Sequence, residues 1–390
     1  MRICIITHCF PRFKNDVFGN WTPDFAHMLM EKGQEVSILT PRMAAPVVPG
    51  DVSDWPFRVD YFDWGRGETR LGNLSIFNPF HVIKLATFLR NGVRILKSLV
   101  ETLNIDLCLG IWAIPGGYLS YRVHQETGVP YAVWALGSDI NVYGRNPVFR
   151  PVIKKVLVHA DYLFANSRNL IAKVSQWSGK TCAFMPTNRV LPQERVAPLE
   201  KTGGKKTFVY IGRLERVKGV DVLIEALAKL RQEGCQAELH IVGDGEEKSV
   251  LEKSVSEARL GDRVSFAGWA SPAEVTSYIR ASDAVVLPSR SEGMPVVFWE
   301  AMQMNTPVIV TDVGDMAEYT RKYGVGKVVP PENPAALKEA LREFIEDHVH
   351  INYANIAVLA EESSLAKATD TFLHTISPPR RNVNEGHENP

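Results

Sequence analysis

The chain alternates short apolar runs with helix-length amphipathic segments over almost its whole length. The apolar runs are rich in Val, Ile and Leu, and polar and apolar residues recur at helical spacing between them. Continuous apolar runs are typical of strands that are buried on both faces, and strands that alternate with helices form parallel sheets joined by crossover helices. The sequence therefore predicts an α/β protein.

The alternation occurs in two series, which predicts two Rossmann-like domains with a ligand cleft between them. In the first series we expect strands at 2–7, 35–40, 106–111, 130–135 and 162–165, and helices at 21–32, 80–103, 147–160 and 167–177. In the second we expect strands at 207–212, 237–242, 263–266, 284–287 and 307–311, and helices at 219–233, 245–259, 272–280, 293–304 and 334–347. The polar segment 197–206 between the series is interpreted as a linker.

Composition fits a two-domain globular protein and excludes several other classes. The 390 residues are 45% hydrophobic and 23% charged, and no run of about 20 apolar residues predicts a transmembrane helix. The short apolar N-terminus is interpreted as a first strand rather than a signal peptide. Five cysteines, an odd number in no metal-binding spacing, favour a reducing cytoplasm. We expect no bound metal and no nucleic-acid partner.

Charge is unevenly distributed along a chain whose formal net charge is zero. Residues 1–190 hold 21 Lys and Arg against 14 Asp and Glu, a net +7, which leaves −7 for the remainder. A basic first half could face an anionic membrane or substrate, or the asymmetry could be ordinary scatter. Helix 80–103 is amphipathic and fits either core packing with a solvated face or membrane docking. Its basic residues are Lys84, Arg90, Arg94 and Lys97.

Two carboxylates, Glu292 and Glu300, are separated by seven residues at the start of an expected helix. Their separation along a helix is about 12 Å. Carboxylate pairs in glycosidases lie roughly 5–9.5 Å apart, so a hydrolytic pair is disfavoured. The spacing suits a ligand that lies along the helix start with one polar group near each glutamate. A capped surface helix with two solvated acids fits the spacing equally well.

Two cations, Arg213 and Lys218, lie between an expected strand and helix. A guanidinium and an ammonium close together can neutralise a departing diphosphate, although two solvated loop cations would give the same pattern. Gly243-Asp244-Gly245 also follows a strand, but a lone Gly-x-Gly is weak. Lys248 stands where the nicotinamide fingerprint requires a third glycine, which disfavours a dehydrogenase.

Several motifs in a matching order resemble the retaining glycosyltransferase family 4, the glycosyl transferases group 1, which has the GT-B fold. They match over roughly residues 205–345, and more loosely over 1–190. The motifs are Gly212-Arg213-Leu214 with Lys218-Gly219, Val242-Gly243-Asp244-Gly245, Glu292-Gly293-Met294-Pro295, Glu300-Ala301-Met302 and Thr306-Pro307-Val308. The resemblance implies two facing domains, 1–196 and 197–352. It also implies a helix, 353–376, that crosses back to the first domain. We expect residues 377–390 to form a disordered tail.

The resemblance also assigns roles to individual residues. Arg213 and Lys218 would stabilise the leaving diphosphate, Glu292 would orient the donor sugar and Glu300 would hold the nucleotide ribose. The other expected donor-binding residues are Gly19, Gly243, Gly268, Trp269, Gly293, Met294 and Val296. Gly19 fits an ordinary loop glycine equally well.

On the acceptor side the candidates are His8 and Asp139. Asp139 would accept a hydrogen bond from the acceptor or support its own loop. Many family members have histidine at the position of Leu136, which puts the identity of the donor sugar in doubt. The segment from His8 to Val17 is a candidate acceptor lid.

The sequence thus predicts a cytoplasmic retaining glycosyltransferase that needs no cofactor and no metal. It would move a hexosyl unit from a UDP- or GDP-linked sugar to a hydroxyl group of a carbohydrate or lipid-linked acceptor. A surface polysaccharide and peripheral contact with the inner face of the membrane are further expectations. The alternatives are a GT-B epimerase or hydrolase acting on nucleotide sugars, and a non-catalytic protein that binds them.

Overall fold

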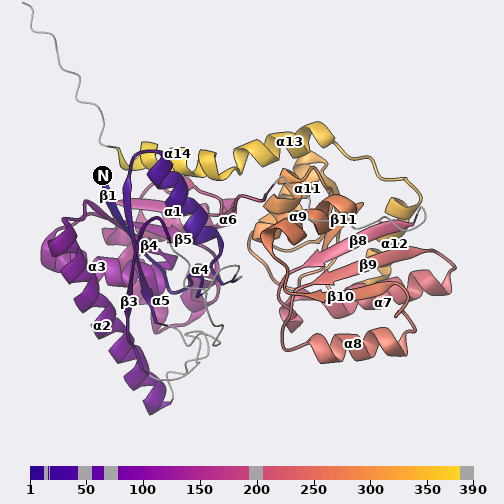
Figure 1. Cartoon of the computed structure of the whole chain (residues 1–390), viewed down its shortest axis with the longest axis horizontal. Coiled ribbons are helices and arrows are strands. Elements are labelled where there is room, and N and C mark those ends of the chain that lie inside the picture. The colour runs from indigo at the N-terminus through magenta and orange to yellow at the C-terminus, as the bar shows by residue number, and fades with distance from the viewer. Residues whose placement is uncertain (13–15, 17, 43–54, 66–77, 193–204, 378–390) are drawn as a thin grey trace, which may run out of the picture.

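The computed structural model of the chain describes residues 1–377 except 13–15, 17, 43–54, 66–77 and 193–204. Two separate parallel sheets lie side by side, each with helices on both faces (Figure 1). This arrangement confirms the predicted α/β class with two Rossmann-like domains. The expected linker 197–206 lies almost wholly outside the described residues, as does the expected tail, and the segment from His8 to Val17 lies partly outside them.

The first sheet has seven strands in the order β3-β2-β1-β4-β5-β6-β7. Its strands are β1 (Arg2–Ile6), β2 (Glu35–Pro41), β3 (Arg58–Phe62), β4 (Leu107–Ile111), β5 (Tyr131–Ala135), β6 (Tyr162–Ala165) and β7 (Ala183–Phe184). Its helices are α1 (Trp21–Glu31), α2 (Pro79–Leu103), α3 (Tyr118–Thr127), α4 (Ser138–Asn141), α5 (Phe149–His159) and α6 (Arg168–Ser178). Strand order reverses beside β1, which pairs with β2 on one side and β4 on the other.

The second sheet has six strands in the order β10-β9-β8-β11-β12-β13. Its strands are β8 (Lys206–Ile211), β9 (Ala237–Val242), β10 (Val264–Gly268), β11 (Ala284–Leu287), β12 (Val308–Thr311) and β13 (Gly326–Val329). Its helices are α7 (Val220–Gln232), α8 (Lys248–Glu257), α9 (Pro272–Ala281), α10 (Val296–Gln303), α11 (Gly314–Tyr323) and α12 (Pro334–Ile345). Here strand order reverses beside β8, which pairs with β9 and β11.

The reversal points determine where a ligand binds. In open α/β sheets, ligands bind beyond the carboxyl ends of the strands where strand order reverses, because adjacent loops diverge there and leave a crevice. His8 follows β1 and Trp112 follows β4, while Gly212 follows β8 and Pro288 follows β11. The fold therefore has two such crevices, one in each domain.

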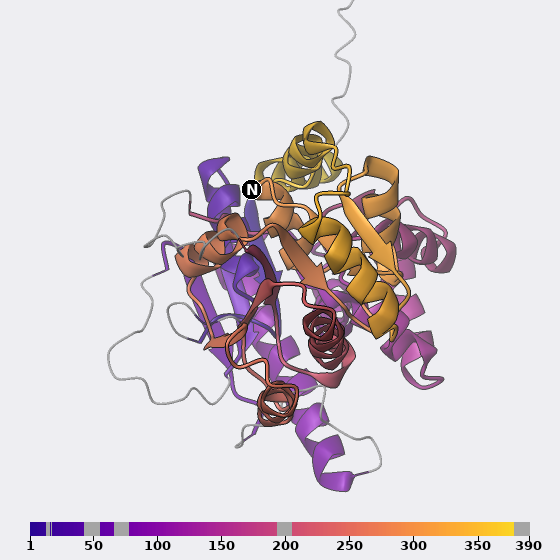
Figure 2. The ribbon, with the colours of Figure 1, turned by 90° about the vertical axis from the view of Figure 1, so that its right-hand side faces the viewer.

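The C-terminal segment forms two helices, α13 (Tyr353–Glu362) and α14 (Leu365–Ile376), so the prediction of one helix over 353–376 was wrong. The helix is interrupted at Ser364, whose hydroxyl accepts a hydrogen bond from the Lys367 N–H and caps α14. The two helices run across both domains (Figure 1), and they lie together at the top of the molecule when it is viewed from its side (Figure 2).

Each of the two C-terminal helices packs on a different domain. In α13, Ile356 and Leu359 belong to the core of the second domain. In α14, Phe372 packs against Phe25 and Phe164 in the core of the first domain. The segment therefore connects the two domains a second time, as the resemblance implies. No helix in the described part of the chain is long and apolar enough to span a bilayer.

Candidate active site

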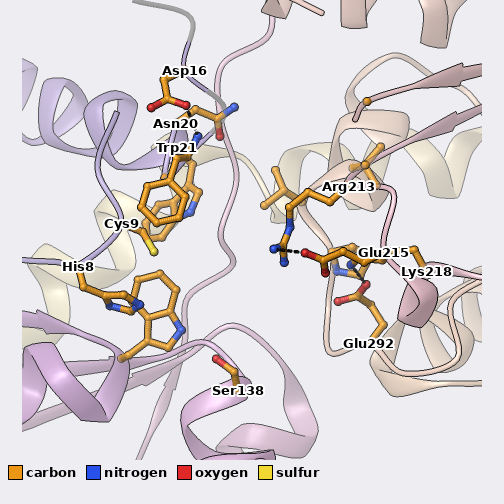
Figure 3. Close-up of a pocket in the computed structure, with 18 of the residues that line it drawn as sticks. His8, Cys9, Asp16, Asn20, Trp21, Ser138, Arg213, Glu215, Lys218 and Glu292 are labelled. Carbon is orange, nitrogen blue, oxygen red and sulfur yellow. Dashed lines mark hydrogen bonds and ion pairs between the residues drawn. The ribbon is translucent and has the colours of Figure 1, made fainter. Parts of the chain in front are cut away.

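A cleft of about 1250 Å³ lies between the two domains and takes residues from both of them. His8, Gly19 and Trp112 line it on one side, and Arg213 and Lys218 on the other. Figure 3 shows His8 on one wall and Arg213 and Lys218 on the opposite wall. The cleft thus joins the two crevices that the strand order creates.

The two predicted leaving-group cations lie on the wall formed by the second domain, and each pairs with a carboxylate. Arg213 Nη1 donates to Glu215 Oε1 at 2.5 Å, and Lys218 Nζ forms an ion pair with Glu292 Oε2. The Arg213 side chain is 51% exposed, whereas that of Lys218 is 20% exposed. Two positive and two negative charges therefore balance at this wall, and an entering anionic diphosphate can replace the carboxylates as the partner of both cations.

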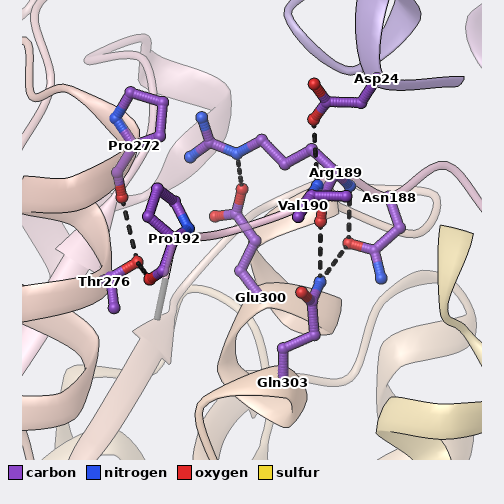
Figure 4. Close-up of polar contacts among 9 residues, drawn as sticks. All are labelled: Asp24, Asn188, Arg189, Val190, Pro192, Pro272, Thr276, Glu300 and Gln303. Atoms are coloured by element: carbon purple, nitrogen blue, oxygen red, sulfur yellow. Dashed lines mark hydrogen bonds and ion pairs between the residues drawn. The ribbon is translucent and has the colours of Figure 1, made fainter. Parts of the chain in front are cut away.

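Glu300 also lines the cleft, but it is only 3% exposed and pairs with Arg189. Arg189 Nε donates to Glu300 Oε1, and its side chain is 8% exposed. Arg189 comes from the connection between the two domains rather than from the second domain itself (Figure 4). The carboxylate expected at the ribose is thus already bound by a guanidinium.

Two of the predicted glycines line the cleft where the backbone makes close turns. Gly243 has φ 136° and Gly19 has φ 70°, values that residues with a side chain rarely adopt. A Cβ at Gly243 would collide with the Gly212 carbonyl, and one at Gly19 with the Cys9 carbonyl. Both glycines therefore have a structural reason to be present, whether or not their N–H groups bind a ligand.

The remaining predicted donor residues lie in different environments. Val296, the first residue of α10, lines the cleft, whereas Met294 is buried. The expected start of this helix at 293 was three residues early, because Pro295 occupies the N-cap position. Trp269 is 50% exposed at the cleft, which leaves its indole face available to a ring. Gly293 and Gly268 are partly exposed beside these residues and are not among those that line the cleft.

His8 lies on the wall formed by the first domain, with its ring 4.4 Å from that of Trp112. Burial lowers the pKa of His8 from 6.5 to about 4, so the imidazole is neutral near pH 7. Its Nδ1 is buried and has no hydrogen-bond partner in the described part of the chain. A neutral imidazole in this place can donate to or accept from an acceptor hydroxyl.

Asp139 is fully buried and supports its own loop, the second of the two roles considered for it. Its carboxylate accepts hydrogen bonds from the backbone N–H groups of Ala113, at 2.8 Å, and Gly137, at 2.9 Å. Burial raises its pKa, and these hydrogen bonds oppose that effect. Asp139 therefore shapes the loops after β4 and β5, and the adjacent Ser138 lines the cleft in its place.

Comparison with known proteins identifies the fold and a family match over part of the chain. Residues 193–358 match the family model described as glycosyl transferases group 1. This part of the chain, which contains the whole second sheet, is therefore similar to the group 1 glycosyltransferases. Over 371 residues, 90% of each chain, the sequence is 28% identical to TuaC of Bacillus subtilis (strain 168), a glycosyltransferase assigned to teichuronic acid biosynthesis. The sequence is also 24% identical to the N-acetyl-alpha-D-glucosaminyl L-malate synthase of Bacillus anthracis over 361 residues, 89% of this chain and 88% of the other.

Solved structures show the same GT-B fold as this glycosyltransferase. Sucrose-phosphate synthase from Thermosynechococcus elongatus superposes with a TM-score of 0.72 at 21% identity, over 96% of this chain and 94% of the other. Anabaena HepE in complex with UDP and glucose superposes with a TM-score of 0.71 at 17% identity, over 96% and 99% of the two chains. The predicted fold and the predicted transferase activity are confirmed.

Glu215, Trp112 and Arg189 are among the residues of the glycosyltransferase cleft that were not predicted from the sequence. Glu215 lies two residues after Arg213, and opposite charges at that spacing could have indicated the pair. Trp112 has φ 64°, an unusual value for a large side chain, which the sequence does not indicate. Arg189 is 111 residues from its partner Glu300, so no local pattern links them. Within the described residues, no group of three or more His, Cys, Asp and Glu side chains is placed to hold a metal ion.

Proposed function

We propose that this glycosyltransferase moves a hexosyl unit from a UDP- or GDP-linked sugar to a hydroxyl acceptor, with retention of configuration and without a metal ion. One observation carries the proposal: Arg213 and Lys218 lie on one wall of the interdomain cleft, each held by a carboxylate. Two fixed cations can stabilise the charge that develops on a leaving diphosphate, because they need little reorganisation during the reaction.

The paired carboxylates give a sequence of events for the reaction. The donor diphosphate binds to Arg213 and Lys218 in place of the carboxylates of Glu215 and Glu292. Both carboxylates then lose their ion-pair partners. Glu292 then accepts hydrogen bonds from the donor sugar hydroxyls. The bond between the anomeric carbon and the phosphate oxygen breaks, and its electron pair leaves with the diphosphate. The acceptor oxygen bonds to the anomeric carbon on the same face, and its proton passes to a phosphate oxygen of the leaving group.

The acceptor in this proposal is a growing surface polysaccharide or its lipid-linked precursor, at the inner face of the membrane. Two features support it. The relative TuaC is assigned to teichuronic acid biosynthesis. The wall of the first domain also carries apolar side chains from α2, the segment after β4 and α5, which suit an acceptor with an apolar portion. They include Val82, Leu85, Leu89, Ile114, Val148, Phe149 and Val152.

The proposal is tested by incubating the protein with a panel of UDP- and GDP-sugars and a lipid-linked saccharide, with and without excess EDTA. We expect release of the nucleoside diphosphate and a new glycoside in both conditions, with NMR showing the anomeric configuration of the donor. Activity that disappears with EDTA and returns with Mn²⁺ or Mg²⁺ would contradict the metal-free mechanism. Binding of a nucleotide sugar without transfer or hydrolysis would favour a sensor, and an epimerised or hydrolysed sugar would favour the other enzyme classes.

A further inference from the structure

The connection between the domains supplies a charged side chain to the floor of the cleft. Arg189 and Glu300 both line the cleft, yet they are 8% and 3% exposed. Glu300 is the carboxylate that the proposed function assigns to the nucleotide ribose. A carboxylate buried to this extent is costly unless a countercharge lies beside it, and the Arg189 guanidinium is that countercharge.

The hydrogen bond between these side chains determines which oxygen of the Glu300 carboxylate can accept a hydrogen bond from a ligand. Arg189 Nε donates to Glu300 Oε1, which orients the carboxylate about its own axis. Oε2 then remains as an acceptor for the cleft. A vicinal pair of ribose hydroxyls needs an acceptor held in one orientation, because each hydroxyl must donate along a defined direction.

The backbone that carries Arg189 is held from both domains (Figure 4). Gln303, on the turn of α10 after Glu300, donates through Nε2 to Asn188 Oδ1 at 2.7 Å and to the Arg189 carbonyl at 3.1 Å. From the first domain, Asp24 Oδ2 accepts from the Val190 N–H at 3.0 Å. Hydrogen bonds to both domains therefore hold the backbone that carries the guanidinium.

We propose that Arg189 is a positioning residue for ribose recognition. It holds Glu300 in the orientation that binds the ribose hydroxyls and has no part in the chemistry at the anomeric carbon. This inference rests on the proposed function of Glu300 in the same cleft. A purely structural role, in which the ion pair only attaches the connection to α10, predicts equal losses for every ligand.

The experiment compares ribose with 2′-deoxyribose ligands by isothermal titration calorimetry. UDP and GDP are each paired with their 2′-deoxy counterparts and titrated into wild type, Arg189→Gln, Arg189→Lys, Glu300→Gln and the double variant Arg189→Gln/Glu300→Gln. We expect wild type to bind the ribose form about tenfold more tightly, as for loss of one hydrogen bond to a charged group. Arg189→Gln and Glu300→Gln should each reduce the ratio of the two affinities, ribose form to 2′-deoxy form, to near one. The double variant should have the same ratio as either single variant.

Two further variants separate positioning from structure. Arg189→Lys keeps the charge but not the guanidinium Nε–H, so it should restore the discrimination only in part. Gln303→Met breaks hydrogen bonds that hold the same connection but keeps the ion pair with Glu300, so it should reduce the ratio much less than Arg189→Gln does. Thermal unfolding of every variant shows whether it is folded before its binding is compared.

The outcomes separate the inference from the proposed function. An unchanged ratio in Arg189→Gln, or an equal loss of discrimination in Gln303→Met, overturns the positioning role. A wild-type ratio of one also overturns it but leaves the transfer reaction standing, because transfer is assayed separately. Failure of wild type to bind either nucleoside diphosphate overturns this inference and the nucleotide-sugar proposal together.

Discussion

At the residue scale, the roles of Arg213, Lys218 and Glu300 predict different kinetic defects. Interactions that strengthen in the transition state change kcat, whereas equal binding of ground and transition states changes KM. Arg213→Ala and Lys218→Ala should each lower kcat by about 10²–10³-fold, or about 2.7–4 kcal/mol, by analogy with loss of an oxyanion donor. Glu300→Ala should mainly raise the donor KM. Saturation kinetics with a fixed acceptor measure both effects.

A matched control for these variants is available on the same turn. Arg216 is exposed and is not among the residues that line the cleft, so Arg216→Ala should leave kcat close to that of wild type. Lys218→Arg should recover only part of the lost kcat, because a planar fork replaces a compact ammonium group. A near-normal kcat in both alanine variants, at Arg213 and at Lys218, would remove the leaving-group role.

His8 predicts a dependence of stability on pH. Its pKa is about 4 in the folded protein, against 6.5 in an unfolded chain. Between these values the unfolded state binds a proton that the folded state does not, so stability is lost as the pH falls. The difference corresponds to at most about 3 kcal/mol. Urea unfolding at pH 7 and pH 4.5 should show that His8→Gln loses less stability than wild type; parallel losses would count against a buried neutral imidazole.

The sequence identified several of the cleft residues but not all of their partners. Arg213, Lys218, Glu292 and Glu300 were found because their spacing matches a family motif. Glu215 and Arg189, which neutralise two of these charges, belong to no motif that was considered. Charge pairing depends on which segments the fold brings together, and Arg189 approaches Glu300 only after the two domains are assembled. Asp139 was found by its place in a loop, yet its function is decided by the backbone N–H groups around it.

At the element scale, the inner strands were predicted well, whereas most of the edge strands and several helices were missed. The inner strands β1, β4, β5, β11 and β12 consist mostly of apolar residues, and their predicted bounds agree with the structure to within a residue. β3 was missed because it is a partly exposed edge strand of sequence Arg-Val-Asp-Tyr-Phe. β7 and β13 are short edge strands, and α11 is largely polar. α3 was missed because Gly116-Gly117 precedes it and resembles a turn.

Helix α2 has features of both a core-packed helix and a membrane-docking helix, the two interpretations that its sequence allowed. Phe88 and Leu99 are buried in the core of the first domain, as for a packed helix. The first turns of the helix instead expose Phe80, at 74%, and Ile83, at 63%. Lys97 forms an ion pair with Glu126 at 3.0 Å, so its charge is already partly compensated. An exposed apolar end beside basic residues is typical of a surface that docks to anionic lipid.

This helix predicts salt-sensitive binding to anionic vesicles. Each engaged Lys or Arg contributes about 1 kcal/mol near such a surface, and salt screens the interaction. Changing Lys84, Arg90, Arg94 and Lys97 together to Ser should abolish binding in a sedimentation assay, while vesicles of neutral lipid serve as the control for wild type. If wild type fails to sediment with anionic vesicles at low salt, only the packing role of α2 remains.

At the scale of the whole molecule, the two domains are joined by chain segments that cross at one place. The first is the connection that contains Asn188, and the second is the break between α13 and α14. Asn188 Nδ2 donates to the Ser363 carbonyl at 2.9 Å, and Asn188 Oδ1 accepts from Gln303 Nε2 at 2.7 Å. Closure of the cleft around a donor would turn the domains about this point, because the described part of the chain passes from one domain to the other only here.

The crossing predicts that Asn188 controls how far the domains close. Asn188→Leu removes the side-chain hydrogen bonds to Ser363, Gln303 and the Arg189 N–H, and it should leave each domain folded because none of these partners lies in a sheet. We expect a larger radius of gyration by small-angle X-ray scattering without ligand, and a smaller compaction when a nucleoside diphosphate is added. The donor KM should rise, since binding then has to order the domains as well. Asn355→Ala, which breaks a hydrogen bond to Tyr323 within the second domain, is the matched control. Equal scattering curves and equal KM values for wild type and Asn188→Leu would show that closure does not turn about this crossing.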